Sequence, residues 1–137
     1  MPVWKRKIIK KAKPWGHEDR DGSMFNVGAE VIHIKEGHRT SLKKMTTKNQ
    51  IYICVSGLVK AYCPEETEFT ENFEIVIKPG DQICVTKGTA YRLEGLKDSI
   101  LVEISDSGVP QVLQGIEMLD DDYGRKGVHP KIVNFKV

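Results

Sequence analysis

Residues 37–57 read GHRTSLKKMTTKNQIYICVSG, and residues 80–95 read GDQICVTKGTAYRLEG. Each stretch begins and ends with glycine and holds short runs rich in β-branched and aromatic residues, which are typical of strands. Gly57 separates two such runs and predicts a hairpin turn, and Pro79-Gly80 predicts another turn. These two stretches therefore predict closely spaced strands joined by tight turns.

The same pattern continues on both sides of these stretches. Short strand-like segments recur with turn signals every 8–12 residues, and nothing before residue 110 shows a helical period. The expected strands are residues 24–34, 50–56, 58–63, 73–78, 82–86, 90–94, 99–105 and 131–137. We therefore predict an all-β barrel or sandwich that forms a single domain over residues 1–137.

The two ends of the chain differ from the middle. Residues 1–20 carry seven Lys or Arg against two acidic residues, and we expect residues 1–12 to form a basic arm that covers a sheet edge. Residues 110–137 form an extension in which we expect one short helical turn and a last strand. The expected arm either pairs with the neighbouring sheet edge or covers it. It lacks the aromatic residues interleaved with basic ones that single-strand binding requires, so no nucleic-acid partner is expected.

Composition sets the expected compartment. No apolar run reaches the ~18 residues of a membrane span, and the first residues do not resemble a secretory signal. We therefore expect a cytoplasmic protein with no membrane partner. The three cysteines, Cys54, Cys63 and Cys84, form no C-x-x-C pair and lie in strand-like sequence, so we expect buried reduced thiols.

The spacing of both glycine-bounded stretches resembles the two sequence motifs of the cupin superfamily, G-x5-H-x-H-x4-E-x6-G and G-x5-P-x-G-x2-H-x3-N. Within that superfamily, four segments resemble the cupin domain of type II mannose-6-phosphate isomerases. They are Lys13-Pro14-Trp15-Gly16 with Glu18, Gly37 to Leu42, Tyr91-Arg92-Leu93-Glu94, and Asp122-Tyr123-Gly124-Arg125. The resemblance implies a double-stranded β-helix, or jelly roll, and a site for a sugar phosphate.

The metal ligands of that family are not retained. Carried over by position, its Gln, His, Glu and His fall on Lys43, Met45, Gln50 and Tyr91. A protonated lysine has no lone pair, methionine suits soft ions, and tyrosine ligates only when deprotonated. We therefore expect no metal and no other cofactor, and the metal-assisted isomerisation that the resemblance implies loses its electrophile.

Strand alternation places the candidate pocket residues on the inner side of the barrel. They are Lys43, Met45, Thr47, Gln50, Tyr52 and Tyr91. One hypothesis is a metal-free pocket for a small carbohydrate or sugar phosphate, in which Lys43 replaces the lost cation. A second is an isomerase or epimerase with Lys43 and Tyr91 as its acid–base pair. A third is a non-catalytic dimeric scaffold, with the pocket filled by side chains. Under any of the three hypotheses we expect a homodimer.

Histidines outside the motifs offer one more possibility. His33 and His38 flank Gly37, and His17 and His129 lie near the two ends. Two histidines on strands could meet a third and build a metal site displaced from the family position. Surface histidines without a metal are the alternative.

Overall fold

The part of the chain that the structure describes forms twelve β-strands, and the predicted all-β class is confirmed. The computed structural model of the protein describes residues 3–20, 27–64, 73–106, 115–124 and 127–130. Its strands are β1 (Ile9–Lys13), β2 (Gly16–Arg20), β3 (Gly28–Ile34), β4 (Leu42–Met45), β5 (Gln50–Ser56), β6 (Val59–Cys63), β7 (Phe73–Ile77), β8 (Gln82–Val85), β9 (Ala90–Gly95), β10 (Ser99–Ser105), β11 (Gly115–Asp120) and β12 (Gly127–Pro130). Within the described ranges, no helix has the length and apolar character that a membrane crossing requires.

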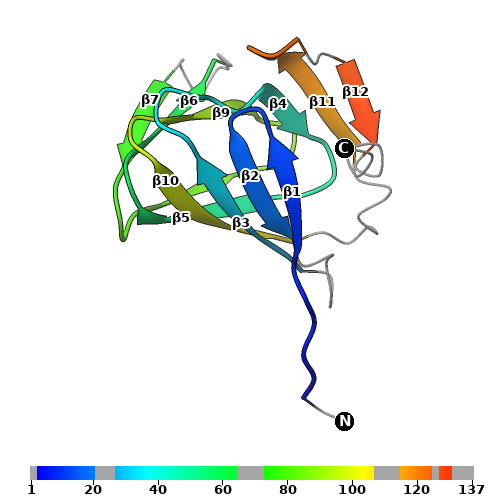
Figure 1. The fold of residues 1–137 in the computed structure, drawn as a ribbon. Coiled ribbons are helices and arrows are strands. Elements are labelled where there is room, and N and C mark those ends of the chain that lie inside the picture. Colours follow the sequence, from blue (N-terminus) through cyan, green and yellow to red (C-terminus); the bar gives the residue numbers. More distant parts are fainter. Residues whose placement is uncertain (1–2, 21–26, 65–72, 107–114, 125–126, 131–137) are drawn as a thin grey trace.

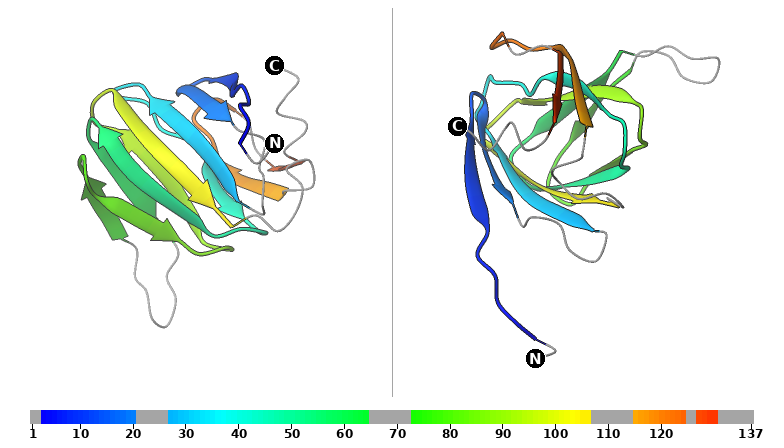
Figure 2. Two further views of the ribbon diagram at one scale, coloured as in Figure 1. Left: turned by 90° about the horizontal axis from the view of Figure 1, so that it is seen from below. Right: turned by 90° about the vertical axis from the view of Figure 1, so that its right-hand side faces the viewer.

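The strands form two antiparallel sheets that curve around a common interior (Figures 1 and 2). The first sheet has the order β1-β2-β3-β10-β5-β8, and the second has the order β12-β11-β4-β9-β6-β7. Neighbours in a sheet are often distant in the chain, as when β10 lies between β3 and β5. Such crossed connections are those of a jelly roll. They pair the two glycine-bounded stretches in both sheets, β5 with β8 in the first and β4 with β9 in the second.

The interior is built by strict alternation along the strands. Every second residue of β3 is buried, from Gly28 to Ile34, and β10 alternates in nearly the same way. The apolar core lies between the sheets and consists of Trp15, Ile32, Ile34, Tyr52, Cys54, Val59, Ala61, Ile77, Val85, Tyr91, Leu93 and Leu101. Cys54 and Cys63 are buried, whereas Cys84 is exposed on β8, contrary to the expectation for all three thiols.

Gly57 shows why glycine is needed at a motif position. Its φ is +90°, which side chains rarely tolerate, and a Cβ there would lie 2.4 Å from the Asp98 carbonyl oxygen and 2.3 Å from Ser99 Oγ. The Ser99 hydroxyl accepts the Leu58 N–H at 3.0 Å and donates to the Lys97 carbonyl at 2.7 Å, which fixes this crossing. The turn between β5 and β6 thus packs against the start of β10 too closely for any side chain.

The two ends of the chain compare differently with the prediction. Within the expected arm of residues 1–12, residues 9–12 belong to edge strand β1 and pair with β2, while residues 3–8 extend away from both sheets (Figure 1). In the C-terminal extension, residues 115–120 form strand β11 instead of a helical turn, because they pair with β4 on one side and β12 on the other. Residues 111–114 and the expected strand at 131–137 lie outside the described residues.

Candidate functional site

The interior of the barrel narrows to a cavity of about 30 Å³. Such a volume has room for about one water molecule. Of the six predicted pocket residues, Lys43, Met45 and Gln50 line this cavity. The complete lining is Lys13, Trp15, Glu18, Arg20, Ser41, Lys43, Met45, Lys48, Gln50, Glu103 and Met118. Thr47 is not among these residues, and Tyr52 and Tyr91 belong to the apolar core beneath them.

Gln50 joins the two tyrosines in a closed ring of hydrogen bonds. Its Nε2 donates to the Tyr52 hydroxyl at 3.1 Å, and its Oε1 accepts from the Tyr91 hydroxyl at 3.0 Å. The two hydroxyls also bond each other, so each phenol has a donor and an acceptor. Burial raises the pKa of both phenols well above its ordinary value, and the nearby Glu103 carboxylate adds to the rise. Both tyrosines are therefore neutral at physiological pH.

Beside this ring lies a buried network of charged residues that our sequence reasoning missed. Arg20 approaches Glu18 at 2.7 Å and Glu30 at 3.6 Å, with side chains that are 1%, 8% and 4% exposed. Lys48 pairs with Glu103 at 3.2 Å, and Gln50 Nε2 donates to the same carboxylate at 2.9 Å. Lys13 reaches Glu18 at 3.5 Å. The interior therefore holds paired charges where an apolar core is usual.

Sheet register explains how these residues meet. Arg20 lies opposite Glu30, Glu30 opposite Glu103, and Glu103 opposite Tyr52, so one polar row crosses four strands. The alternation of buried and outward-facing residues along β3 and β10 could have revealed Glu30 and Glu103 from the sequence. Glu30 shares a face with Ile32 and Ile34 in β3, and a charged residue on the apolar face of a strand indicates an interior polar site.

Lys43 lies at the margin of the cavity. It is half-buried, and its ammonium lies 5.6 Å from the centre of the Tyr91 ring, a cation–π contact. The cavity lining holds four cations, including Lys43, and two carboxylates, and a third buried carboxylate, Glu30, contacts Arg20 from beside the lining. The group as a whole has a net formal charge of +1, and a positive excess of this kind favours anions.

The four positions that correspond to the family's metal ligands do not fit a divalent ion. Lys43 is a cation, and Met45 packs against Met118 in a small apolar cluster. The oxygen of Gln50 accepts the Tyr91 proton, and Tyr91 is a neutral phenol. These contacts leave no anionic donor among the four positions.

Three buried carboxylates nearby require a separate test. Glu18, Glu30 and Glu103 each place an oxygen within 4.8 Å of the others, close enough to share a cation. The Arg20 guanidinium already contacts two of them, and the Lys48 ammonium contacts the third. Protein cations thus supply the positive charge that a metal ion brings to such a cluster.

Strand β11 closes the barrel mouth on the side of β4. Met118 lines the cavity opposite Met45, and Met118 and Lys43 are register partners across the two strands. Because β11 belongs to the C-terminal extension, access to the cavity depends on how firmly this extension is held.

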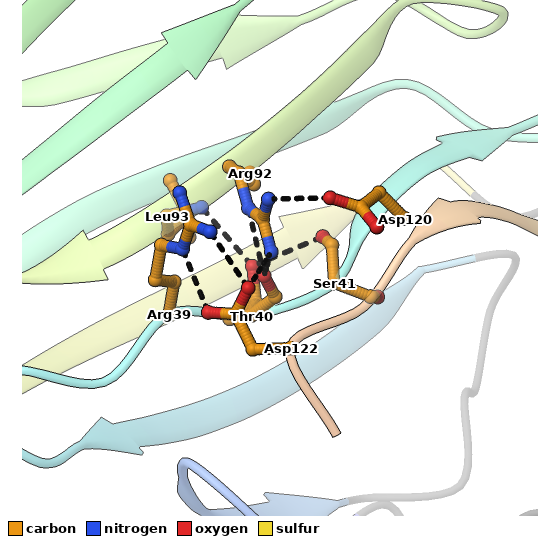
Figure 3. Close-up of polar contacts among 7 residues, drawn as sticks. All are labelled: Arg39, Thr40, Ser41, Arg92, Leu93, Asp120 and Asp122. Carbon is orange, nitrogen blue, oxygen red and sulfur yellow. Dashed lines mark hydrogen bonds and ion pairs between the residues drawn. The ribbon is translucent and has the colours of Figure 1, made fainter. Parts of the chain in front are cut away.

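Two arginines hold the turn that follows β11 (Figure 3). Arg39 donates to both carboxylate oxygens of Asp122, at 2.7 and 2.6 Å. The buried Arg92 donates twice to the Thr40 carbonyl, at 3.1 and 3.0 Å, and reaches Asp120 and Asp122 at 3.4 Å each. The hydrogen bonds from Arg39, with the charge of Arg92, lower the pKa of Asp122.

The histidines do not gather as the displaced-site hypothesis required. His17 and His33 stack on each other on the outer face of the first sheet. His38 instead stacks on Tyr123, with ring centres 6.3 Å apart. The side chain of His129 lies outside the described residues. The three described histidines therefore do not form the trio of the displaced-site hypothesis, which was one of two possibilities.

Comparisons with known proteins establish the fold. No protein-family model and no curated protein sequence matches the chain. Among solved structures, it is similar to an oxalate decarboxylase from Lactobacillus farciminis, with a TM-score of 0.66 and 13% identity over 82% of this chain and 33% of that chain. It is also similar to KdgF from Halomonas sp., with a TM-score of 0.63 and 14% identity over 77% of this chain and 96% of that chain.

A third similar structure is a cupin-2 domain containing protein from Shewanella frigidimarina, with a TM-score of 0.50 and 10% identity over 60% of this chain and 72% of that chain. The predicted cupin fold, a jelly-roll barrel, is thereby confirmed. The chain spans about a third of the decarboxylase chain, so this likeness concerns the barrel alone. The specific resemblance to mannose-6-phosphate isomerases stays a prediction.

Proposed function

We propose that this cupin-fold chain is a metal-independent binding protein for a small anionic carbohydrate, such as a sugar phosphate or a sugar acid. The observation that carries the proposal is the excess of cations around the cavity. Lys13, Arg20, Lys43 and Lys48 line it against Glu18 and Glu103. A phosphate or carboxylate accepts charge-assisted hydrogen bonds from such groups, each worth roughly 1.5–3 kcal/mol.

The size of the cavity limits what enters. Ligand pockets usually measure about 300–1,000 Å³, whereas this cavity measures about 30 Å³. A phosphate or carboxylate is already larger than the single water molecule for which the cavity has room, so the anionic group and the sugar ring both require Met118 to move aside. The proposal therefore includes an outward displacement of β11, which is held by the Arg39 and Arg92 contacts described above.

Catalysis by an acid–base pair receives less support from the site. Lys43 faces the ring of Tyr91, whereas the Tyr91 hydroxyl is bonded to Tyr52 and Gln50. General acid–base catalysis needs a group with a pKa near the working pH and within hydrogen-bond reach of the substrate. The raised pKa of Tyr91 and its absence from the cavity lining do not meet that need.

A thermal-shift titration tests the proposal. Mannose 6-phosphate and a uronic acid at millimolar concentration should raise the melting temperature, and neutral mannose should raise it less. Lys43→Met should remove the shift. Lys44→Met is the matched control, because Lys44 is the next residue of β4, points to the opposite face and does not line the cavity. The proposal is wrong if no anionic sugar stabilises the wild-type protein, or if Lys43→Met keeps the full shift.

A second candidate function, a dimeric scaffold, is favoured by the outer face of the first sheet. Alternate residues of β5 and β10 point outward, and Ile51, Val55 and Ile104 are 36%, 52% and 36% exposed. The partly buried neighbours Val31, Ile53, Ile100 and Val102 belong to the same face. An apolar face of this extent on a sheet commonly marks an interface.

The occupant that we propose for this face is a second copy of the chain. The three seven-residue strands of this sheet, β3, β5 and β10, cover about 330 Å² at ordinary strand spacing, and a stable dimer needs about 800 Å² from each partner. Residues 3–8 extend from the sheet and expose Val3, Trp4 and Ile8, so they can supply the missing area by reaching across to the partner.

Light scattering at tens of micromolar protein distinguishes the outcomes. We expect a dimer that Ile51→Lys dissociates and that deletion of residues 1–8 weakens. Ile75→Lys is the control, since Ile75 is 43% exposed on β7, which belongs to the other sheet. A monomeric wild-type protein, or a dimer that Ile51→Lys leaves intact, contradicts this interface without bearing on the sugar pocket.

A further inference from the structure

A half-buried cluster of metal-binding residue types lies on the outer side of the barrel. His17 on β2 is the direct cross-strand partner of His33 on β3. Asp19 follows His17 by two residues, so alternation places both on one face of β2. Glu18 and Arg20 alternate with these two residues along β2 and point into the barrel. His17 and Asp19 therefore lie on the outer face. The cluster is thus separate from the interior network.

The three side chains are close enough to share one ion. His33 Nε2 lies 3.1 Å from Asp19 Oδ2, and one ligand atom of each residue lies within 4.8 Å of the other two. Two ligands of a tetrahedral ion, at bonds of about 2.0–2.1 Å, stand roughly 3.3 Å apart. The Asp19–His33 pair already has this separation, and the His17 ring closes the remaining gap by rotating about its side-chain bonds.

We propose that His17, Asp19 and His33 form a site for a divalent first-row transition metal such as Zn²⁺ on the outer face of the first sheet. Imidazole and carboxylate donors suit zinc, copper and nickel. Three protein ligands leave at least one coordination position for water or for a group on another molecule. The paired strands β2 and β3 hold two of the ligands opposite each other, so little backbone ordering opposes binding.

The surroundings of the cluster act in both directions. His17 and His33 stack with ring centres 3.9 Å apart, so both rings already lie side by side at the cluster. Lys10 lies opposite Asp19 in the register of β1 and β2 and repels an ion. Its side chain is exposed and can turn into solvent.

Binding also requires a proton to move. In the metal-free cluster, His33 Nε2 and the Asp19 carboxylate share a hydrogen bond at 3.1 Å. Coordination through Nε2 needs its lone pair, so a proton on that atom shifts to Nδ1 through solvent or is released. The bond to Asp19 is replaced by two bonds to the ion.

Calorimetric titration of the untagged full chain with ZnCl₂ tests the site. A Cys84→Ser background removes the exposed thiol, which would otherwise compete for zinc. We expect one zinc per chain, at least tenfold weaker binding in His17→Ala or His33→Ala, and a smaller loss in Asp19→Asn. His38→Ala is the matched control, because His38 stacks on Tyr123 away from the cluster, and should bind as tightly as the background protein.

A second measurement needs no substitution at the cluster. Substoichiometric Cu²⁺ is paramagnetic and should broaden the amide signals of residues 17, 19 and 33 before those of the rest of the chain. The proposal is overturned if His17→Ala and His33→Ala bind zinc as tightly as the background protein, if His38→Ala loses as much affinity as they do, or if copper broadens other residues first.

Discussion

Replacement of Glu103 by glutamine is the most direct test of the interior charge network. The Lys48 ammonium lies 3.2 Å from Glu103 Oε1, and the two side chains are 3% and 5% exposed. Glu103→Gln keeps the shape of the side chain and removes its negative charge. The Lys48 ammonium then stays in the interior without its anion, a state that costs about 3–5 kcal/mol when a buried pair is broken from one side.

The opposite substitution should be milder. Lys48→Met removes the cation, but Glu103 still accepts the hydrogen bond from Gln50 Nε2 at 2.9 Å. The bond that is lost, from Lys48 to Glu103, is a hydrogen bond to a charged group and contributes roughly 1.5–3 kcal/mol. We therefore expect Lys48→Met to lower the free energy of unfolding by about 2 kcal/mol. In the double variant neither charge is buried alone. Its loss should therefore fall at least about 2 kcal/mol short of the sum of the two single losses.

Urea unfolding followed by tryptophan fluorescence measures these free energies of unfolding. For a chain of 137 residues, a loss of 3–5 kcal/mol corresponds to a fall in melting temperature of roughly 10–15 °C. The reasoning is refuted if Glu103→Gln costs less than about 1 kcal/mol, or if the two substitutions are additive within about 0.5 kcal/mol. Either result means that Lys48 reaches water in the folded protein.

Three further predictions concern a turn, the C-terminal contacts and the metal content. In chemical denaturation, Gly57→Ala should lower the free energy of unfolding by more than about 3 kcal/mol, because the strain of a positive φ adds to a clash with the backbone. Gly88→Ala has a similar positive φ but open space around the new Cβ, so it should lower the free energy of unfolding by about 1 kcal/mol. Because the pKa of Asp122 is lower in the folded protein than its ordinary value of 3.8, the ionised Asp122 stabilises the fold above pH 3.8. This stabilisation is lost as the pH falls through the pKa of Asp122 in the folded protein. In Asp122→Asn, the free energy of unfolding should therefore depend less on pH in the acid range. The His33→Ala variant lacks a ligand of the proposed outer metal site, so any metal that it holds tightly must be bound elsewhere. Purified without chelator, it should hold no stoichiometric zinc, manganese or nickel by elemental analysis. One tightly held equivalent would contradict the metal-free interior.

Strand periodicity and glycine spacing were sufficient to predict the barrel. Residues 50–56 and 99–105 were expected to be strands and are β5 and β10 with the same bounds. Both signals are local, because alternation and positive-φ turns depend on neighbours in the chain. The replacement of the family's metal ligands was visible in the same way, since it needs only the spacing within two motifs.

The C-terminal extension shows where local signals fail. Residues 115–120 carry no clear strand period, and pairing with β4 and β12 decides their conformation. Tertiary context overrides weak local preference in such segments. The same strand places Met118 at the barrel mouth, so the closure of the cavity could not have been predicted from the candidate pocket residues.

The sequence by itself determined the fold class and the turn positions. Only the tertiary structure decided which charges meet. Lys48 and Glu103 are 55 residues apart, and His17 and His33 become neighbours only through the register of β2 and β3. The physical reason is that pairing of distant strands aligns the alternating residues of each strand into rows across the sheet. Which residues share a row can be known only when the register of the strands is known.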